Sequence, residues 1–159
     1  MIEVIAEIAN SHQGKISIAK KIINNFKNSG SSSIKFQIYF ADEFMSKNHS
    51  RFKHFKKQGF SHDQLKDLFN YSRKLGYNKI YADVLGFKAF EIARSLKVDG
   101  YKIHSTDLMN LDLLKKVSKK KKKVFLSVGG AKHPEIYKAV KIFNVQKIKP
   151  VLMHGYQSY

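Results

Sequence analysis

The feature that most constrains the fold is a regular alternation of short apolar segments with longer segments of helical periodicity. The six predicted strands lie near Ile2–Ala6, Ser33–Ile38, Lys79–Ala82, Gly100–Ile103, Val124–Ser127 and Pro150–His154. Such alternation predicts a parallel sheet whose crossovers are helices. It leaves two architectures open, namely part of a (β/α)8 barrel with sequential strand order, or an open doubly wound sheet.

The five predicted helices are marked by start and stop signals. Ser61 and Gln64 are spaced as a capping box, and Pro134 suits the first turn of the last helix. Ser17 is the expected N-cap of the first helix, and Gly30 is expected to end it. The five helices are expected near residues 18–28, 62–75, 87–96, 108–117 and 134–143. The sequence therefore predicts one α/β domain over residues 1–159.

The stretch from Tyr39 to Phe60 has no clean period. It interleaves basic residues with Phe52 and Phe55, a composition that also occurs in nucleic-acid-binding surfaces. The alternative, which we favour, is an excursion that packs its aromatic side chains onto the rest of the domain.

A net charge of +18 would suit a polyanionic partner such as nucleic acid. The lysines, however, are spread over the whole chain, and most fall at predicted helix-surface positions. The one dense run, Lys119–Lys123, lies between a predicted helix and a predicted strand, as expected of an exposed loop. We therefore expect no specific nucleic-acid partner and keep non-specific binding as an alternative.

Several function classes lack their sequence signals. The chain has no cysteine for a disulfide framework or thiolate chemistry, and neither G-x-G-x-x-G nor G-x-x-x-x-G-K-[ST] for a nucleotide. No apolar run approaches the length of a membrane span. Glu3 and Glu7 interrupt the region where a signal peptide would be apolar. We expect a cytoplasmic protein without membrane association.

Two of the predicted strands carry a lysine among apolar residues. Lys35 and Gln37 lie two apart and therefore share one side of their strand, while Lys102 is followed three positions on by Ser105. Burying an ammonium group is costly unless an anion meets it. Two such lysines converging from different strands would form an anion site, most simply for phosphate. Exposed edge strands with both lysines in water are the alternative.

Polar residues gather where the predicted strands end: Glu7, Gln37, Asp83, Ser105, Ser127 and His154. The carboxyl ends of parallel strands are where βα folds build their sites. His12 and His104 lie nearby as site groups or as loop and packing histidines.

Five segments, in order along the whole chain, carry a family resemblance. They are AEIANSHQG (Ala6–Gly14), IKFQ (Ile34–Gln37), YKIHSTDL (Tyr101–Leu108), LSVGG (Leu126–Gly130) and MHGYQSY (Met153–Tyr159). They resemble the patterns A-E-I-G-x-N-H-x-G, V-K-F-Q, Y-K-I-x-S-x-D-L, L-S-T-G-M and L-H-C-x-x-x-Y of the N-acetylneuraminate (sialic acid) synthase family. The resemblance implies a TIM-type (β/α)8 barrel, of which this chain would form the N-terminal part.

The resemblance also implies an activity. Members of the family condense phosphoenolpyruvate with an N-acylated aminosugar such as N-acetylmannosamine, giving a nonulosonic acid and phosphate. They need a divalent metal, Mn²⁺ or Mg²⁺, and the full-length proteins are expected to be homodimers. The implied phosphoenolpyruvate-binding residues are Lys35, Lys102, Ser105 and Ser127. Gln37 and Tyr159 are implied on the sugar, with Glu7 as the catalytic residue that orients the sugar or moves a proton.

Some positions depart from the family pattern. Asp83 stands where the family often has a threonine that helps to bind phosphoenolpyruvate, and Ser11 replaces an asparagine before His12. The barrel units that would supply two metal-ligating histidines and the antifreeze-like C-terminal domain have no counterpart in these 159 residues. We therefore expect a fragment or split subunit that is inactive alone, with an anion-binding protein or an inactive remnant as alternatives.

Overall fold

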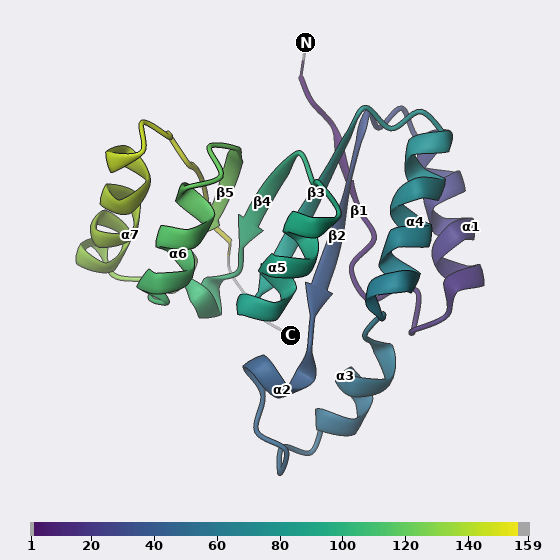
Figure 1. Ribbon diagram of the computed structural model, residues 1–159, viewed down its shortest axis with the longest axis horizontal. Coiled ribbons are helices and arrows are strands. Elements are labelled where there is room, and N and C mark those ends of the chain that lie inside the picture. The colour runs from purple at the N-terminus through teal and green to yellow at the C-terminus, as the bar shows by residue number, and fades with distance from the viewer. Residues whose placement is uncertain (1, 156–159) are drawn as a thin grey trace.

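The computed structural model describes residues 2–155, which form a parallel sheet of six strands in the order β1-β2-β3-β4-β5-β6 (Figure 1). The strands are β1 (Ile5–Glu7), β2 (Ser33–Tyr39), β3 (Lys79–Leu85), β4 (Gly100–Ile103), β5 (Lys123–Ser127) and β6 (Val151–Met153). Sequential order in a curled parallel sheet is that of a partial barrel, so the barrel prediction is confirmed and the doubly wound alternative is wrong.

Seven α-helices and one 3₁₀ turn connect the described strands. They are α1 (Ile16–Lys27), α2 (Ala41–Phe44), α3 (Phe52–Gln58), α4 (His62–Lys74), α5 (Phe87–Ser95), η1 (Ser105–Asp107), α6 (Leu111–Ser118) and α7 (His133–Val145). Five of the α-helices correspond to predicted ones. The two additional helices, α2 and α3, form the excursion after β2, and Figure 1 shows them beyond the arrowhead of that strand.

Local signals located most helix ends, with two corrections. The capping box is confirmed, because Gln64 N–H donates to Ser61 Oγ at 3.3 Å and Ser61 N–H donates to Gln64 Oε1 at 2.9 Å. Ser17 is not an N-cap, since α1 already begins at Ile16. The helix expected from Leu108 begins three residues later, because η1 intervenes and the Asn110 side chain caps α6.

The first strand is shorter than predicted. Ile2 and Val4 are exposed, and β1 begins only at Ile5, whose partner in the register is Ser33, the first residue of β2. Before Ile5, the Val4 carbonyl accepts the Ser33 N–H at 3.4 Å, but the paired register begins only at Ile5. At the other edge, all three residues of β6 are exposed, with Leu152 at 48%.

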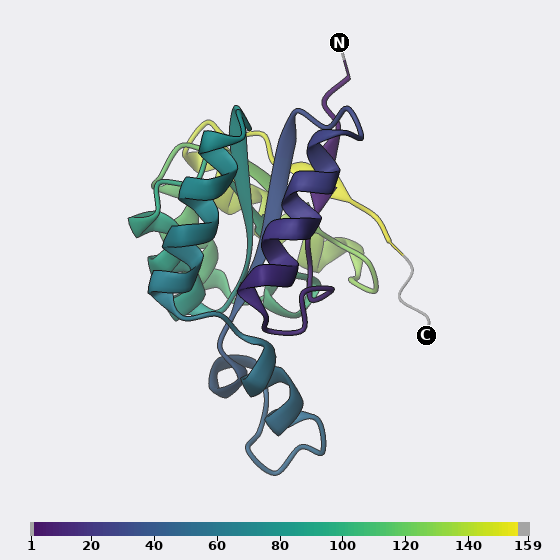
Figure 2. The same ribbon diagram turned by 90° about the vertical axis from the view of Figure 1, so that its right-hand side faces the viewer.

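The sheet has two different faces. On β2, Ile34, Phe36 and Ile38 are at most 1% exposed and pack in the core under the helices, which line one face of the sheet in Figures 1 and 2. Because side chains alternate along a strand, Lys35 and Gln37 face the opposite side, which is the interior of the partial barrel. The candidate site lies on this interior face, at the carboxyl ends of the strands.

Candidate active site at the carboxyl ends of the strands

The strand register places the predicted polar residues on the interior face in two rows. Glu7 is opposite Lys35 across β1 and β2. One step toward the carboxyl ends, Gln37, Asp83 and Lys102 lie in line on β2, β3 and β4. Side chains at paired positions point to the same face. Lys35 and Lys102 therefore lie on the same face of the sheet, which a common anion site requires.

Each of these lysines is held by a carboxylate. Lys35 Nζ forms an ion pair with Glu7 Oε2, and Lys102 Nζ lies 2.5 Å from Asp83 Oδ2. The lysine side chains are only 9% and 14% exposed, so they need these partners to offset the loss of hydration. The formal charges of the two lysines and the two carboxylates add up to zero. An incoming anion must therefore share the lysines with these carboxylates or displace the carboxylates from them.

Asp83, the departure from the family pattern, is almost fully enclosed. Its side chain is 3% exposed, and Oδ1 has no hydrogen-bond partner among the described residues, whereas Oδ2 binds Lys102. A threonine could not neutralise the lysine in this way. Asp83 is thus the counter-ion of Lys102 in this chain, a role that the sequence alone did not indicate.

A cleft of about 710 Å³ opens beside this row. Its lining comes from the loop after β1, the ends of β2 and β3, the excursion, and the segment after β4: Asn10, Gln37, Tyr39, Phe44, Arg51, His54, Phe55, Gln58, Leu85, His104 and Thr106. Such a size suits a small polar ligand. Gln37, implied on the sugar by the resemblance, lies in this cleft.

The excursion supplies an aromatic wall to the cleft. The rings of Tyr39, Phe44 and Phe55 meet edge to face, with centroids 5.5 to 5.8 Å apart. The Arg51 guanidinium lies over Phe55 at 5.1 Å from the ring centroid. These rings pack on one another, whereas Phe60 lies in the core and stacks on His12, and Phe40 packs against the core. The expected packing of aromatic side chains onto the domain is therefore confirmed at Phe40 and Phe60.

The wall is fixed to the barrel by Glu43. Its carboxylate accepts hydrogen bonds from the backbone N–H of Lys88 at 2.9 Å and of Ala89 at 3.3 Å, at the start of α5. Gly86, at φ +88°, precedes this turn, and a Cβ there would lie 2.9 Å from Glu43 Oε2. A carboxylate at a helix N-terminus is favourable, so α2 is anchored on α5.

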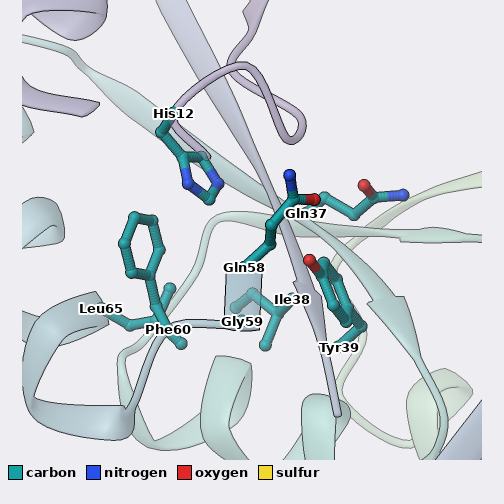
Figure 3. A pocket seen from close by; sticks show the side chains of 8 residues that line it. All are labelled: His12, Gln37, Ile38, Tyr39, Gln58, Gly59, Phe60 and Leu65. Carbon is teal, nitrogen blue, oxygen red and sulfur yellow. The ribbon is translucent and has the colours of Figure 1, made fainter. Parts of the chain in front are cut away.

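Tyr39 is the residue that the sequence analysis missed. Tyr39 lies two residues after Gln37, so its side chain is on the same interior face of β2 as those of Lys35 and Gln37. This spacing is the signal that could have identified it. The side chain is 4% exposed, its hydroxyl has no partner among the described residues, and burial raises its pKa to about 12. Figure 3 shows the hydroxyl turned toward the side chains of Gln37 and Gln58.

The two histidines left open by the sequence have different settings. His12 is 3% exposed and stacks on Phe60 at 4.1 Å, its Nδ1 accepts the Gly14 N–H at 2.9 Å, and burial lowers its pKa (Figure 3). These contacts make it a packing histidine that shapes the loop after β1. His104 lines the cleft, with Nδ1 3.1 Å from Thr106 Oγ1.

The remaining predicted residues are less closely gathered. Ser105 begins η1 beside Thr106 and is half-buried, and Ser127 is half-buried at the end of β5. Neither belongs to the lining of the cleft as the described residues define it. Tyr159 lies outside the described residues.

The divalent metal implied by the resemblance does not fit the described part of the chain. No group of three or more His, Cys, Asp or Glu side chains among residues 2–155 could hold a metal ion. In the same residues, no helix is long and apolar enough to span a membrane.

Comparison with known proteins bears on the family and the fold. The NeuB family model matches residues 22–159. An uncharacterized protein of Methanocaldococcus jannaschii is 34% identical over 157 residues, covering 98% of this chain and 46% of the relative. The mouse N-acetylneuraminate-9-phosphate synthase is 31% identical over 143 residues, covering 79% of this chain and 38% of the relative.

A solved structure shows the same fold. The N-acetylneuraminic acid synthetase of Leptospira borgpetersenii superposes with a TM-score of 0.91 at 28% identity, covering 98% of this chain and 54% of that one. The chain thus spans about half the length of the relatives it matches. With the family model matching most of its residues, the chain belongs to the NeuB family, that of the N-acetylneuraminate synthases.

Proposed function

We propose that the chain provides the phosphoenolpyruvate site and part of the aminosugar site of a synthase that makes a nonulosonic acid. The observation that carries the proposal is the pair of part-buried lysines, Lys35 and Lys102, on the interior face of β2 and β4. The names of the mouse and Leptospira relatives support a synthase of this kind.

The two lysines are proposed to bind the phosphate and carboxylate of phosphoenolpyruvate. An ammonium group has three donors, so each lysine can keep its carboxylate partner and still bind an anion. Hydroxyl groups of Ser105 and Ser127 would add neutral donors, as the resemblance implies. Positive charge held in place before the substrate arrives stabilises phosphate as it leaves.

The reaction joins two carbon atoms and releases phosphate. C3 of phosphoenolpyruvate attacks the aldehyde carbon of the open-chain N-acylaminosugar, water adds at C2, and the C2–O bond to phosphate breaks. Glu7, 41% exposed and held by Lys35, is placed to orient the sugar or to move a proton. Gln37 is proposed to bind the sugar from the cleft.

The first test is binding of phosphoenolpyruvate by calorimetry. Lys102→Ala should weaken the affinity roughly tenfold or more, because a hydrogen bond to a charged group contributes about 1.5–3 kcal/mol. The matched control is Lys115→Ala, which removes an exposed lysine paired with Asp112 on α6. Equal losses in both variants, or none in either, would refute the site.

A second candidate function is non-specific binding of polyanions, favoured by the net charge of +18. It predicts affinity for single-stranded or duplex nucleic acid that falls steeply with salt and does not depend on sugar. Lys102→Ala should then have no greater effect than Lys115→Ala.

Inactivity of residues 1–159 alone stays a prediction. It is checked by assaying the chain with phosphoenolpyruvate, N-acetylmannosamine and manganese, by itself and with a second polypeptide that carries the remaining barrel strands. Turnover by the chain alone would contradict it. The homodimer implied for full-length members likewise awaits a measurement of mass in solution.

A further inference from the structure

The Tyr39 hydroxyl is a buried donor without a partner. The side chain is 4% exposed, and no described residue accepts a hydrogen bond from its oxygen. Buried hydroxyl groups are nearly always paired, because an unpaired one lowers stability. A phenylalanine at this position would pack in the same way without that cost. The hydroxyl therefore points to a role outside folding.

A second unpartnered polar atom belongs to the same cleft. Asn10 Oδ1 is buried without a hydrogen-bond partner among the described residues, and both Asn10 and Tyr39 line the 710 Å³ cleft. They come from different places, the loop after β1 and the end of β2. Because burial raises the pKa of Tyr39 to about 12, its hydroxyl is a neutral donor at physiological pH.

The two unpaired atoms are complementary to a secondary amide. Such a group presents one N–H donor and one carbonyl acceptor, which match an unpaired carboxamide oxygen and an unpaired phenol hydroxyl. Phe44, Phe55 and Leu85 give the same cleft an apolar wall, suited to a methyl group beside the amide. Glu43 fixes this wall to α5, so the apolar side chains are held in position before a ligand binds.

We propose that Asn10 and Tyr39 recognise the N-acyl group of the aminosugar. The Tyr39 hydroxyl donates to the acyl carbonyl oxygen, the Asn10 side-chain oxygen accepts the amide N–H, and the acyl methyl lies against Phe44 and Phe55. The inference rests on the proposed function, because that function makes an aminosugar the ligand of this cleft. Tyr39 is then a specificity-determining residue for acylated over non-acylated sugars.

The test compares two sugars in the presence of phosphoenolpyruvate. N-acetylmannosamine and mannose are titrated into the wild-type chain and into Tyr39→Phe, with binding followed by ligand-observed NMR. The wild type should prefer the acetylated sugar, and Tyr39→Phe should reduce that preference about three- to tenfold, the value of one neutral hydrogen bond. Affinity for mannose and for phosphoenolpyruvate should stay unchanged. Asn10→Ala should reduce the same preference.

A stability measurement separates recognition from a structural role. Tyr39→Phe should raise the denaturation midpoint, because it removes an unpaired buried hydroxyl. The matched control is Tyr137→Phe on α7, where the side chain is 71% exposed and neither midpoint nor sugar preference should change. A lowered midpoint for Tyr39→Phe would mean that the hydroxyl is bonded within the protein, and would overturn the inference.

The remaining outcomes also decide. An unchanged sugar preference in Tyr39→Phe, with phosphoenolpyruvate binding intact, overturns the inference and leaves the anion site standing. If the chain binds phosphoenolpyruvate but binds neither sugar, the inference is overturned together with the aminosugar part of the proposed function. Loss of the phosphoenolpyruvate site itself is reported separately by Lys102→Ala.

Discussion

The two ends of the interior face of the sheet differ in whether their buried polar atoms have hydrogen-bond partners. At the amino-terminal end, Glu3 accepts hydrogen bonds from Ser33 Oγ at 2.7 Å, Tyr81 OH at 2.8 Å and Lys123 Nζ at 2.8 Å. Lys79 Nζ adds an ion pair at 3.5 Å. Hydrogen bonds from Lys123 and Ser33 hold the pKa of Glu3 down at about 2.

At the carboxyl end, polar atoms remain without partners. Asn10 Oδ1, Tyr39 OH and Asp83 Oδ1 are all buried and unpaired among the described residues. One carboxylate at the amino-terminal end thus links residues of β2, β3 and β5, whereas the carboxyl end keeps three buried polar atoms that no described residue satisfies. This difference is what we expect if the amino-terminal end serves stability and the carboxyl end holds the proposed site, as in barrels whose sites lie at the carboxyl ends of the strands.

The largest expected effect is on the buried pair nearest the site. Asp83→Ala leaves Lys102 enclosed without a counter-ion, which should cost about 3–5 kcal/mol of stability in urea denaturation. Adding Lys102→Met should recover much of the loss. The control, Asp112→Ala, breaks an exposed pair on α6. A loss for Asp83→Ala no larger than that of the control would show that the buried pair does not matter to folding.

The next effect sharpens the contrast at the amino-terminal end. Glu3→Ala leaves the Tyr81 hydroxyl without its acceptor in a side chain that is 1% exposed, so stability should fall by about 1–3 kcal/mol. Affinity for phosphoenolpyruvate should be unchanged, since Glu3 lies at the opposite end of the sheet. A variant that folds normally but binds phosphoenolpyruvate more weakly would break the division between the two ends.

The same carboxylate predicts a pH dependence. Folding lowers the pKa of Glu3 from 4.5 to about 2, so the unfolded chain takes up its proton first as the pH falls. The stability that Glu3 contributes is therefore complete above about pH 4.5 and is lost toward pH 2. Urea midpoints measured across this range should fall less steeply in Glu3→Gln than in the wild type. Parallel curves would exclude Glu3 as a source of acid sensitivity.

The smallest change in stability is expected at Glu7. Its side chain is 41% exposed, so Glu7→Gln, which keeps an acceptor for Lys35, should alter stability by less than about 1 kcal/mol. A role in orienting sugar should instead appear as weaker sugar binding with phosphoenolpyruvate present. A large loss of stability without any effect on sugar binding would place Glu7 with the structural residues.

Local patterns in the sequence determined the strands, their parallel direction and most helix ends, whereas the sequential strand order was implied only by the family resemblance. Alternation on β2 placed Lys35 and Gln37 on one face, and the capping box fixed the start of α4, because both depend on neighbours a few residues away. The family motifs, which run in order along the chain, predict a site on the same interior face.

Tertiary structure decided which groups meet there. Lys102 is neutralised by Asp83, nineteen residues earlier, and Glu43 anchors the excursion on α5 forty-five residues later. No local period predicts such partners, because strand register and helix packing bring them together. The helices α2 and α3 gave no periodic signal because, at four and seven residues, they are too short to show a helical period. The spacing of Tyr39 from Lys35 and Gln37 on one face of the strand was visible in the sequence. Only packing decides whether its hydroxyl has a hydrogen-bond partner.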